Sequence, residues 1–328
     1  MNKPENVKLE VYKFNLNPGR NYAGNITFRD LFLKVLSVPN NTSNENLFIA
    51  FFRALVTTLD TEYKQIKNKA FTLINTNNET SFNSNNQTIF GILDGGPLGE
   101  GKTRRKLSDK NDENALDGNV INDKYFFYIH IPLNSDRGYI MFQVYQQDSI
   151  RHEFFNYIFK GLFKHDPDYN MPNFDPYLPQ SIKDEFKHGA KVKELKFTEK
   201  LLSREIDESA SFVSINEEYK IEVKITPVRS TFGTQFLNSL LTPFLSKEFN
   251  NKKLEDFDGK KITLKNRQTK RDATFELDGT GDIMPRIYLH NRISISPYGV
   301  PNFDELKVFC DNLLSEIVNT EPRVQEIE

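Results

Sequence analysis

The chain has 328 residues, which is enough for two domains, and although only 38% of them are apolar, 28 Phe and 13 Tyr can fill a substantial core. This composition excludes a chain that is disordered throughout. Lys and Arg number 43 against 45 Asp and Glu, which gives a formal net charge of -2. A globally basic protein is therefore excluded, and contact with nucleic acid or another acidic surface requires a local basic patch.

A single cysteine, Cys310, cannot form an intramolecular disulfide or anchor a Cys-rich zinc site, which is typical of a reducing compartment. The first residues lack the apolar segment of a signal peptide, and no apolar run approaches the roughly 20 residues of a membrane span. The abundance of Asn, Lys, Ile and Phe is typical of an AT-rich genome. We expect a cytoplasmic bacterial protein without a membrane segment or a bound cofactor, in which Cys310 is a buried structural thiol.

The first part of the chain predicts a strand followed by two helices. Apolar and polar residues alternate over residues 7–14, the pattern of a half-buried strand. Thr27 is placed to cap a helix that begins at Phe28. A second, more buried helix is predicted over residues 44–67, and the stretch rich in Asn, Ser and Thr over residues 75–87 predicts a surface loop.

The next segment, from Gly96 to Thr103, matches G-x-x-x-x-G-K-[ST], the phosphate-binding loop of nucleotide hydrolases. Such a loop needs a strand before it and a helix after it, because the first N–H groups of the helix hold the anion. The residues after Thr103 are too polar to form an amphipathic helix that packs on a sheet. We therefore predict a long, charged, Gly-rich loop over residues 94–121 and keep nucleotide binding as an alternative.

This loop is the leading candidate for a contact surface. Its glycines and its clustered basic residues suit a phosphate group or the acidic surface of a partner. The candidate partner- or phosphate-binding residues are Gly96, Gly99, Gly101, Lys102, Arg104, Arg105 and Lys106. Four acidic residues follow between residues 109 and 117, so a solvated loop of mixed charge is the alternative interpretation.

The strongest local pattern lies over residues 124–163. Two aromatic and β-branched runs, separated by a turn at residues 136–138, predict a β-hairpin. Its second strand leads into a helix that Asp148 or Ser149 can cap and whose apolar residues recur every four positions. Together with the first strand, the hairpin and this helix predict an N-terminal α+β domain over residues 1–164.

Four prolines lie within residues 165–180, where they exclude a helix interior and a central strand. We interpret this segment as a Pro-rich connector to a C-terminal α+β domain over residues 181–328. That domain mixes several strands with a Pro243-interrupted helix near residues 234–248 and a terminal helix after Pro301. The core-facing stripe of the terminal helix is expected to hold Phe303, Leu306, Phe309, Leu313 and Ile317. The fold class is thus α+β, with mixed or antiparallel sheets, packed helices and two domains.

A second candidate site lies on a strand of the C-terminal domain. In the segment YKIEVKI, Glu222 and Lys224 project from one face of the strand, while the apolar residues that alternate with them project from the other. With Asp207 upstream, this spacing resembles the D…ExK arrangement of the PD-(D/E)xK nuclease family. The resemblance implies a catalytic site in which Asp207 and Glu222 hold a divalent metal and Lys224 assists the attacking water. Residues 194–196 fit the same short pattern, and the wet face of an amphipathic strand explains such charges without catalysis.

Other polar features have simpler explanations. The basic run over residues 265–272 has no interleaved aromatic residues for base stacking and predicts a hairpin turn. Asp278 and Asp282 supply too few oxygen ligands for a calcium site. The five histidines lack the spacing of metal ligands.

Because no catalytic constellation is complete, we expect a non-enzymatic accessory protein that engages a macromolecular partner, either a protein subunit or nucleic acid. Residues 94–121 are the expected contact surface. A place in a bacterial antiviral defence or mobile-element system is a further hypothesis. The alternatives are a Mg-dependent nuclease with a PD-(D/E)xK-like site and a nucleotide-binding P-loop protein.

Overall fold

The computed structural model describes residues 7–19, 26–74, 79–106, 108–145, 149–163, 169–182, 190–202, 218–227, 245–249, 252–266, 272–277, 283–284, 287–290 and 292–320. The chain divides into two compact units, each of which combines strands with helical turns. Unit 1 comprises residues 1–177 and 288–328, and unit 2 comprises residues 178–287. The mixed α+β character that the sequence predicts is therefore present in the structure.

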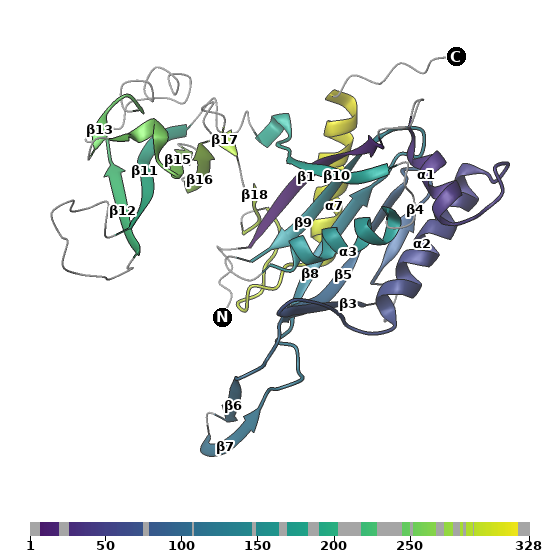
Figure 1. Ribbon diagram of the computed structural model, residues 1–328, viewed down its shortest axis with the longest axis horizontal. Coiled ribbons are helices and arrows are strands. Elements are labelled where there is room, and N and C mark those ends of the chain that lie inside the picture. Colours follow the sequence, from purple (N-terminus) through teal and green to yellow (C-terminus); the bar gives the residue numbers. More distant parts are fainter. Residues whose placement is uncertain are drawn as a thin grey trace. The chain divides into compact units, whose positions relative to one another are not determined.

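Unit 1 is built on a nine-stranded sheet with the order β10-β1-β9-β8-β5-β3-β2, in which β18 also pairs with β1 and β4 also pairs with β5 (Figure 1). Neighbours along this order are antiparallel. The strands are β1 (Lys8–Pro18), β2 (Lys64–Ile66), β3 (Lys69–Ile74), β4 (Ser81–Asn83), β5 (Thr88–Pro97), β8 (Asp123–His130), β9 (Arg137–Val144), β10 (Tyr169–Pro176) and β18 (Ile287–Tyr288). The predicted hairpin is confirmed as β8 and β9.

The helices described in unit 1 are α1 (Phe28–Val35), α2 (Asn44–Asp60), α3 (Arg151–Phe163) and α7 (Phe303–Thr320). The predicted cap of α1 is confirmed, because the Thr27 side chain accepts a hydrogen bond from the Asp30 backbone N–H and the Asp30 carboxylate accepts one from the Thr27 N–H. Helix α2 ends at Asp60 rather than near residue 67, and the chain continues into the short strand β2.

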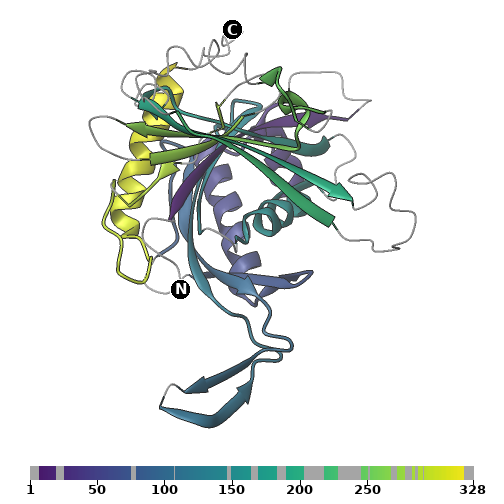
Figure 2. The same ribbon diagram turned by 90° about the vertical axis from the view of Figure 1, so that its left-hand side faces the viewer.

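The central strands of this sheet are buried on both faces. Adjacent residues of a strand point to opposite faces. The Phe127 ring packs against Phe154 of α3, with ring centroids 5.1 Å apart. The ring of the preceding residue, Phe126, stacks on Phe303 of α7, with ring centroids 6.2 Å apart. Figure 2 shows α7 (yellow) on one side of the sheet and α2 and α3 on the other. The abundant aromatic residues thus form two layers, one on each face.

The terminal helix α7 is tied to the sheet of unit 1. The Tyr128 hydroxyl of β8 donates a 2.7 Å hydrogen bond to Asp311, and the Lys307 ammonium donates to the same carboxylate at 2.7 Å. Lys307 also lies 5.0 Å from the ring centroid of Phe90 on β5. The sequence assigned this helix to the C-terminal domain, and the structure places it in unit 1 instead, because its apolar stripe completes the second face of the large sheet.

The predicted connector over residues 165–180 contains a strand. Strand β10 forms the edge of the large sheet and pairs antiparallel with β1 from Tyr169 to Pro176. The register shifts between Asn170 and Asn173, on either side of Pro172, and the Asn17 side-chain amide donates to the Met171 carbonyl at 2.9 Å. Prolines are tolerated at sheet edges and bulges, where no ladder N–H is required. The proline content therefore marks an edge strand, and the chain passes into unit 2 only after residue 177.

The segment predicted as a loop over residues 94–121 instead contains the end of β5 and a separate two-stranded sheet. Strand β5 runs to Pro97, and a two-stranded sheet follows, formed by β6 (Thr103–Lys106) and β7 (Asp109–Ala115). Figure 1 shows this ribbon of residues 97–121 beyond the end of β3 and β5. The strands are polar but paired, because charged residues of opposite sign lie across from each other and the turn glycines Gly101 and Gly118 adopt positive φ angles of 69° and 74°.

Unit 2 contains a five-stranded sheet with the order β12-β11-β15-β16-β17. Its elements are β11 (Ala190–Leu202), β12 (Glu218–Ile225), β13 (Glu248–Phe249), β14 (Lys252–Lys253), the 3-10 turn η4 (Leu254–Asp256), β15 (Gly259–Asn266), β16 (Asp272–Leu277) and β17 (Ile283–Met284). Leu195 and Phe197 of β11 and Ile262 of β15 are almost fully buried. The helix predicted near residues 234–248 lies largely outside the described residues, and residues 248–249 form β13.

Candidate functional site

The glycines of the ribbon allow close backbone contacts. A side chain at Gly96 would place its Cβ 2.0 Å from the Ile121 carbonyl oxygen, and one at Gly99 would lie 2.4 Å from that of Leu116. The residues that follow Thr103 form strand β6, which returns antiparallel as β7. The strand–loop–helix arrangement of a phosphate-binding loop is therefore not formed, and these glycines serve strand packing.

The basic residues of the ribbon lie beside acidic residues. The Arg105 guanidinium forms an ion pair with Glu113, and Lys106 is the ladder partner of Asp109. The Gly101 N–H, which would face an anion in a phosphate-binding loop, donates to the Asp117 carboxylate at 2.8 Å. Lys102 and Arg104 are exposed. The ribbon thus neutralises much of its own positive charge.

In unit 2, the structure brings together the two segments that share the E-x-K pattern. The Glu222 carboxylate of β12 accepts from Lys196 of β11 at 2.8 Å and from Lys220 of its own strand at 2.5 Å. Lys224 in turn lies 2.6 Å from Glu194. These contacts join β11 and β12, which are antiparallel neighbours.

The two ammonium groups of Lys196 and Lys220 lower the pKa of Glu222 to about 2 through their hydrogen bonds. Glu222 is therefore an ion-pair partner that stays ionised. Asp207, the other carboxylate of the nuclease hypothesis, lies outside the described residues. Within the described ranges, no three His, Cys, Asp or Glu side chains gather in a way that could hold a metal ion. The described part of the D…ExK pattern thus forms a charge ladder between strands.

Lysines dominate the exposed face of this sheet, which we term the lysine face. On β11, β12 and β15 its carboxylates are Glu194 and Glu222, and on β16 Glu276 is the ladder partner of Lys261 and Asp272 that of Lys265. Its lysines include Lys196 on β11, Lys220 and Lys224 on β12, and Lys261 and Lys265 on β15. Three of them are direct cross-strand neighbours, since Lys196 is opposite Lys224 on one side and opposite Lys261 on the other. We call Lys224, Lys196 and Lys261 the lysine row.

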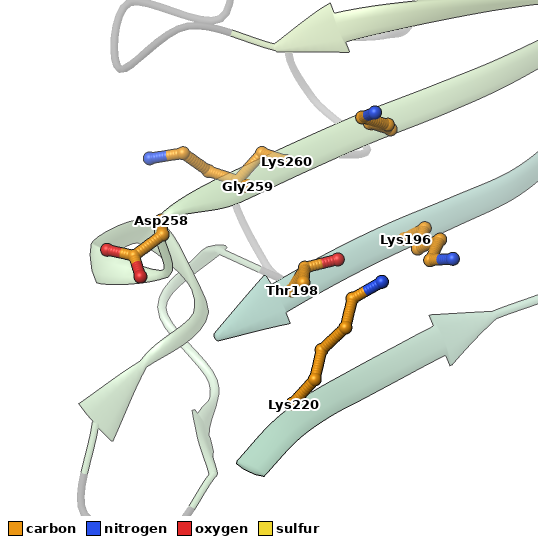
Figure 3. A pocket seen from close by; sticks show the side chains of 7 residues that line it. Lys196, Thr198, Lys220, Asp258, Gly259 and Lys260 are labelled. Atoms are coloured by element: carbon orange, nitrogen blue, oxygen red, sulfur yellow. The ribbon is translucent and has the colours of Figure 1, made fainter. Parts of the chain in front are cut away.

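A pocket opens on the lysine face (Figure 3). Its volume is about 370 Å³. The lining residues are Lys196, Thr198, Lys220, Asp258, Gly259, Lys260 and Lys261. Figure 3 shows Thr198 on the strand between those that carry Lys220 and Gly259, and Thr198 is the ladder partner of both Gly259 and Glu222. Ammonium groups, a hydroxyl and open backbone at a glycine are groups that bind phosphate oxygens.

Unit 1 contains a larger groove of about 830 Å³ between α1, α2, α3 and the turn that joins β2 to β3. Its walls are apolar and include Phe51, Leu55 and Leu59. Lys67 and Glu153, which also line it, carry opposite charges. The charge of this groove therefore favours neither anions nor cations.

Comparison with protein families, with curated proteins and with solved structures found no match to this chain. None of the helices in the described ranges combines the length and the apolar character that crossing a membrane requires. The site must therefore be interpreted from its own chemistry.

The lysine face was missed at the sequence level, although its signal is present. Polar residues, among them several lysines, alternate with apolar ones in the segments KIEVK (residues 220–224) and KITLK (261–265), and lysines also recur in KVKELK (191–196). Each segment alone indicates only the solvent-exposed face of an amphipathic strand. Their significance depends on the order β12-β11-β15, which places the three segments side by side.

Proposed function

We propose that this chain is a non-enzymatic nucleic-acid-binding protein and that the lysine row of unit 2 contacts the phosphate backbone. The observation that carries the proposal is the alignment of Lys224, Lys196 and Lys261 across three neighbouring strands. Neighbouring strands lie about 4.8 Å apart, so the Cα atoms of the three lysines fall within roughly 10 Å of one another.

Such a row is unfavourable for folding alone. Like charges directly opposite each other in a sheet destabilise the pairing. Glu222 and Glu194 compensate part of this repulsion through their contacts with Lys196 and Lys224. The next residue of this ladder is Glu276 of β16, so the like charges are confined to the strands β12, β11 and β15. A polyanion that brings several phosphates to this face relieves the repulsion, which supports a role in binding.

The composition of the face indicates how nucleic acid is bound. Its described positions on β11, β12 and β15 hold lysine, threonine, glutamate and glycine. Bases are read by aromatic stacking or by side chains that reach their edges, whereas lysines contact phosphates regardless of sequence. We therefore propose binding that is independent of sequence and strongly dependent on salt.

The test compares the wild-type chain with the triple variant Lys196→Gln, Lys224→Gln and Lys261→Gln. Binding of a fluorescein-labelled DNA duplex is followed by anisotropy over a series of NaCl concentrations. Each phosphate contact contributes about 0.9 to the slope of log K against log salt, so the triple variant should lose roughly 2.7 from that slope. A triple variant with unchanged affinity and slope disproves the proposal.

Two control variants show whether DNA binding depends on the position of the removed positive charge or only on the net charge of the chain. Lys253→Gln removes a lysine of unit 2 that lies outside the lysine face and pairs with Glu255 at 3.3 Å, so it should leave the slope within experimental error. Replacing Lys102, Arg104, Arg105 and Lys106 of the ribbon with Ala removes the competing basic cluster. Loss of DNA binding in this ribbon variant alone would move the contact from unit 2 to the ribbon.

The nuclease alternative is examined with the same duplex. The chain is incubated with the DNA and Mg²⁺ or Mn²⁺, and the products are separated by electrophoresis. We expect intact DNA, because Glu222 is engaged by two lysines. Cleavage that Glu222→Ala abolishes would replace the binding proposal with the nuclease.

A further inference from the structure

Two lysines that line the pocket of the lysine face are bound by an anion of the chain itself, although that anion, Glu222, is not a lining residue. The Glu222 carboxylate lies between the ammonium groups of Lys196 and Lys220, at 2.8 and 2.5 Å. Both lysines line the pocket. A carboxylate and a phosphate accept hydrogen bonds from the same donors.

We propose that this pocket is a subsite for one phosphate group of the nucleic acid and that Glu222 is its internal stand-in, which the phosphate displaces. The inference rests on the proposed function. It gives Glu222 a role opposite to the catalytic one that the sequence indicated, because the side chain then limits binding instead of enabling a reaction.

The geometry allows this exchange without a change of fold. The Glu222 side chain is 38% exposed, and its contacts are ion pairs at the surface. Exposed ion pairs are weak, so a phosphate that brings a larger charge can displace the carboxylate. Movement of Glu222 about its side-chain torsions is sufficient.

The floor of the pocket leaves room for phosphate oxygens. Gly259 lies directly opposite Thr198, and a Cβ at Gly259 would be 3.3 Å from the Thr198 Cβ. The absence of a side chain there keeps the strand surface open beside the Thr198 hydroxyl, which can donate to an anion. Lys260 and Lys261 add two further lysines to the wall, and Asp258 adds one carboxylate.

The competition between Glu222 and the ligand has a measurable consequence. When Glu222 is ionised, phosphate binding must break its two contacts with lysine. The free energy of binding becomes less favourable by the free energy of those contacts, and the affinity is lower. Glu222→Gln removes the charge while it keeps the size of the side chain. We expect this variant to bind the DNA duplex about two- to fivefold more tightly, the factor that corresponds to an exposed ion pair.

The control is Glu255→Gln, which changes the net charge of unit 2 by the same amount. Glu255 pairs with Lys253 at 3.3 Å, and Lys253, unlike the two lysines that bind Glu222, does not line the pocket. If net charge alone mattered, both variants would gain equally. We expect the gain in Glu222→Gln to exceed that in Glu255→Gln and to disappear when Lys196 and Lys220 are also replaced with Gln.

A second measurement locates the anion. Inorganic phosphate is titrated into the full chain while the amide NMR signals of Thr198 and Gly259 are followed. These signals should shift at lower phosphate concentration in Glu222→Gln than in wild type, whereas chloride at matched ionic strength should leave them in place. Equal titrations for the two proteins would overturn the stand-in role.

The two proposals fail in different ways. If the triple variant of the lysine row binds DNA as wild type does, the proposed function is wrong. If that variant loses binding but Glu222→Gln gains no more than Glu255→Gln, the nucleic-acid surface stands and the subsite is wrong.

Discussion

The two large sheets of this protein differ in the burial and the charge of their faces. The sheet of unit 1 carries buried aromatic residues on both faces, with α3 against Phe127 and α7 against Phe126. The sheet of unit 2 buries Phe197 and Ile262 on one face, and its other face presents the lysines. A sheet covered on both faces stabilises the chain, whereas the charged face of the second sheet is the surface to which we propose that a ligand binds. Substitutions should therefore affect folding in the first sheet and binding in the second.

The largest effect is expected from Phe154→Ala in unit 1. Phe154 is fully buried and lies 5.8 Å from Phe71, 5.1 Å from Phe127 and 5.7 Å from Phe142, measured between ring centroids. Loss of this ring should lower the free energy of unfolding by about 3–5 kcal/mol, because a cavity remains among the neighbouring rings. Urea unfolding followed by circular dichroism measures the change. A loss below about 1 kcal/mol would contradict the description of this layer as close-packed.

The next effect is a loss of stability in acid that arises from His130 of β8. Burial lowers the pKa of this imidazole to about 4, and its Nδ1–H donates to the Asn86 carbonyl at 2.9 Å. Between about pH 6.5 and 4 the unfolded chain binds a proton that the folded chain does not, so stability falls as the pH is lowered through this window.

The contribution of His130 should be about 1–3 kcal/mol at pH 4. It is measured as the difference in pH dependence between wild type and His130→Asn, in which the titrations of the other groups cancel. Parallel stability curves for the two proteins would show that His130 does not titrate differently on folding.

A smaller effect is expected at the base of the ribbon. Gly96→Ala should cost about 1–3 kcal/mol, because its Cβ meets the Ile121 carbonyl and the backbone must move. Gly101→Ala is the matched comparison, since nothing lies within 4 Å of its Cβ and only its φ of 69° opposes the substitution. It should cost about 1 kcal/mol. Amide exchange in β6 and β7 reports the two outcomes, and equal protection in both variants would argue against the close contact.

The smallest effect on stability is expected on the lysine face. Lys196→Gln removes an attraction to Glu222 and also a repulsion from Lys224 and Lys261. The two changes oppose each other, so the free energy of unfolding should change by less than about 0.5 kcal/mol, while DNA affinity falls. A loss of several kcal/mol would mean that this face is built for folding, and the contrast between the two sheets would disappear.

The local elements could be predicted from sequence where one residue or one period decides the structure. The Thr27 cap, the alternation in β1 and the hairpin of β8 and β9 are of this kind. In α7 the helical period was predicted correctly. The buried stripe is rotated relative to the predicted one, because Phe303 and Phe309 are half-buried whereas Cys310 and Leu314 are buried. The exact angle of a stripe depends on the surface against which the helix packs.

The larger arrangement could not be predicted because it depends on contacts between distant residues. Polarity indicated a loop over residues 94–121, yet Arg105 and Glu113 support each other only once the register of β6 and β7 is known. Prolines indicated a connector, yet an edge strand accommodates them beside a bulge. The candidate site could not be predicted for the same reason, because Lys196 forms part of it only through its neighbours on two other strands.

The return of the chain to unit 1 through α7 has a consequence for biosynthesis. The strands of the large sheet up to β10 leave the ribosome before residues 178–287, but the helix that covers Phe126 and Tyr128 leaves only after them. Translation proceeds at about 5–20 residues per second, so this aromatic surface stays uncovered for several seconds or longer in the nascent chain. During that interval it is accessible to chaperones and to premature association with other nascent chains.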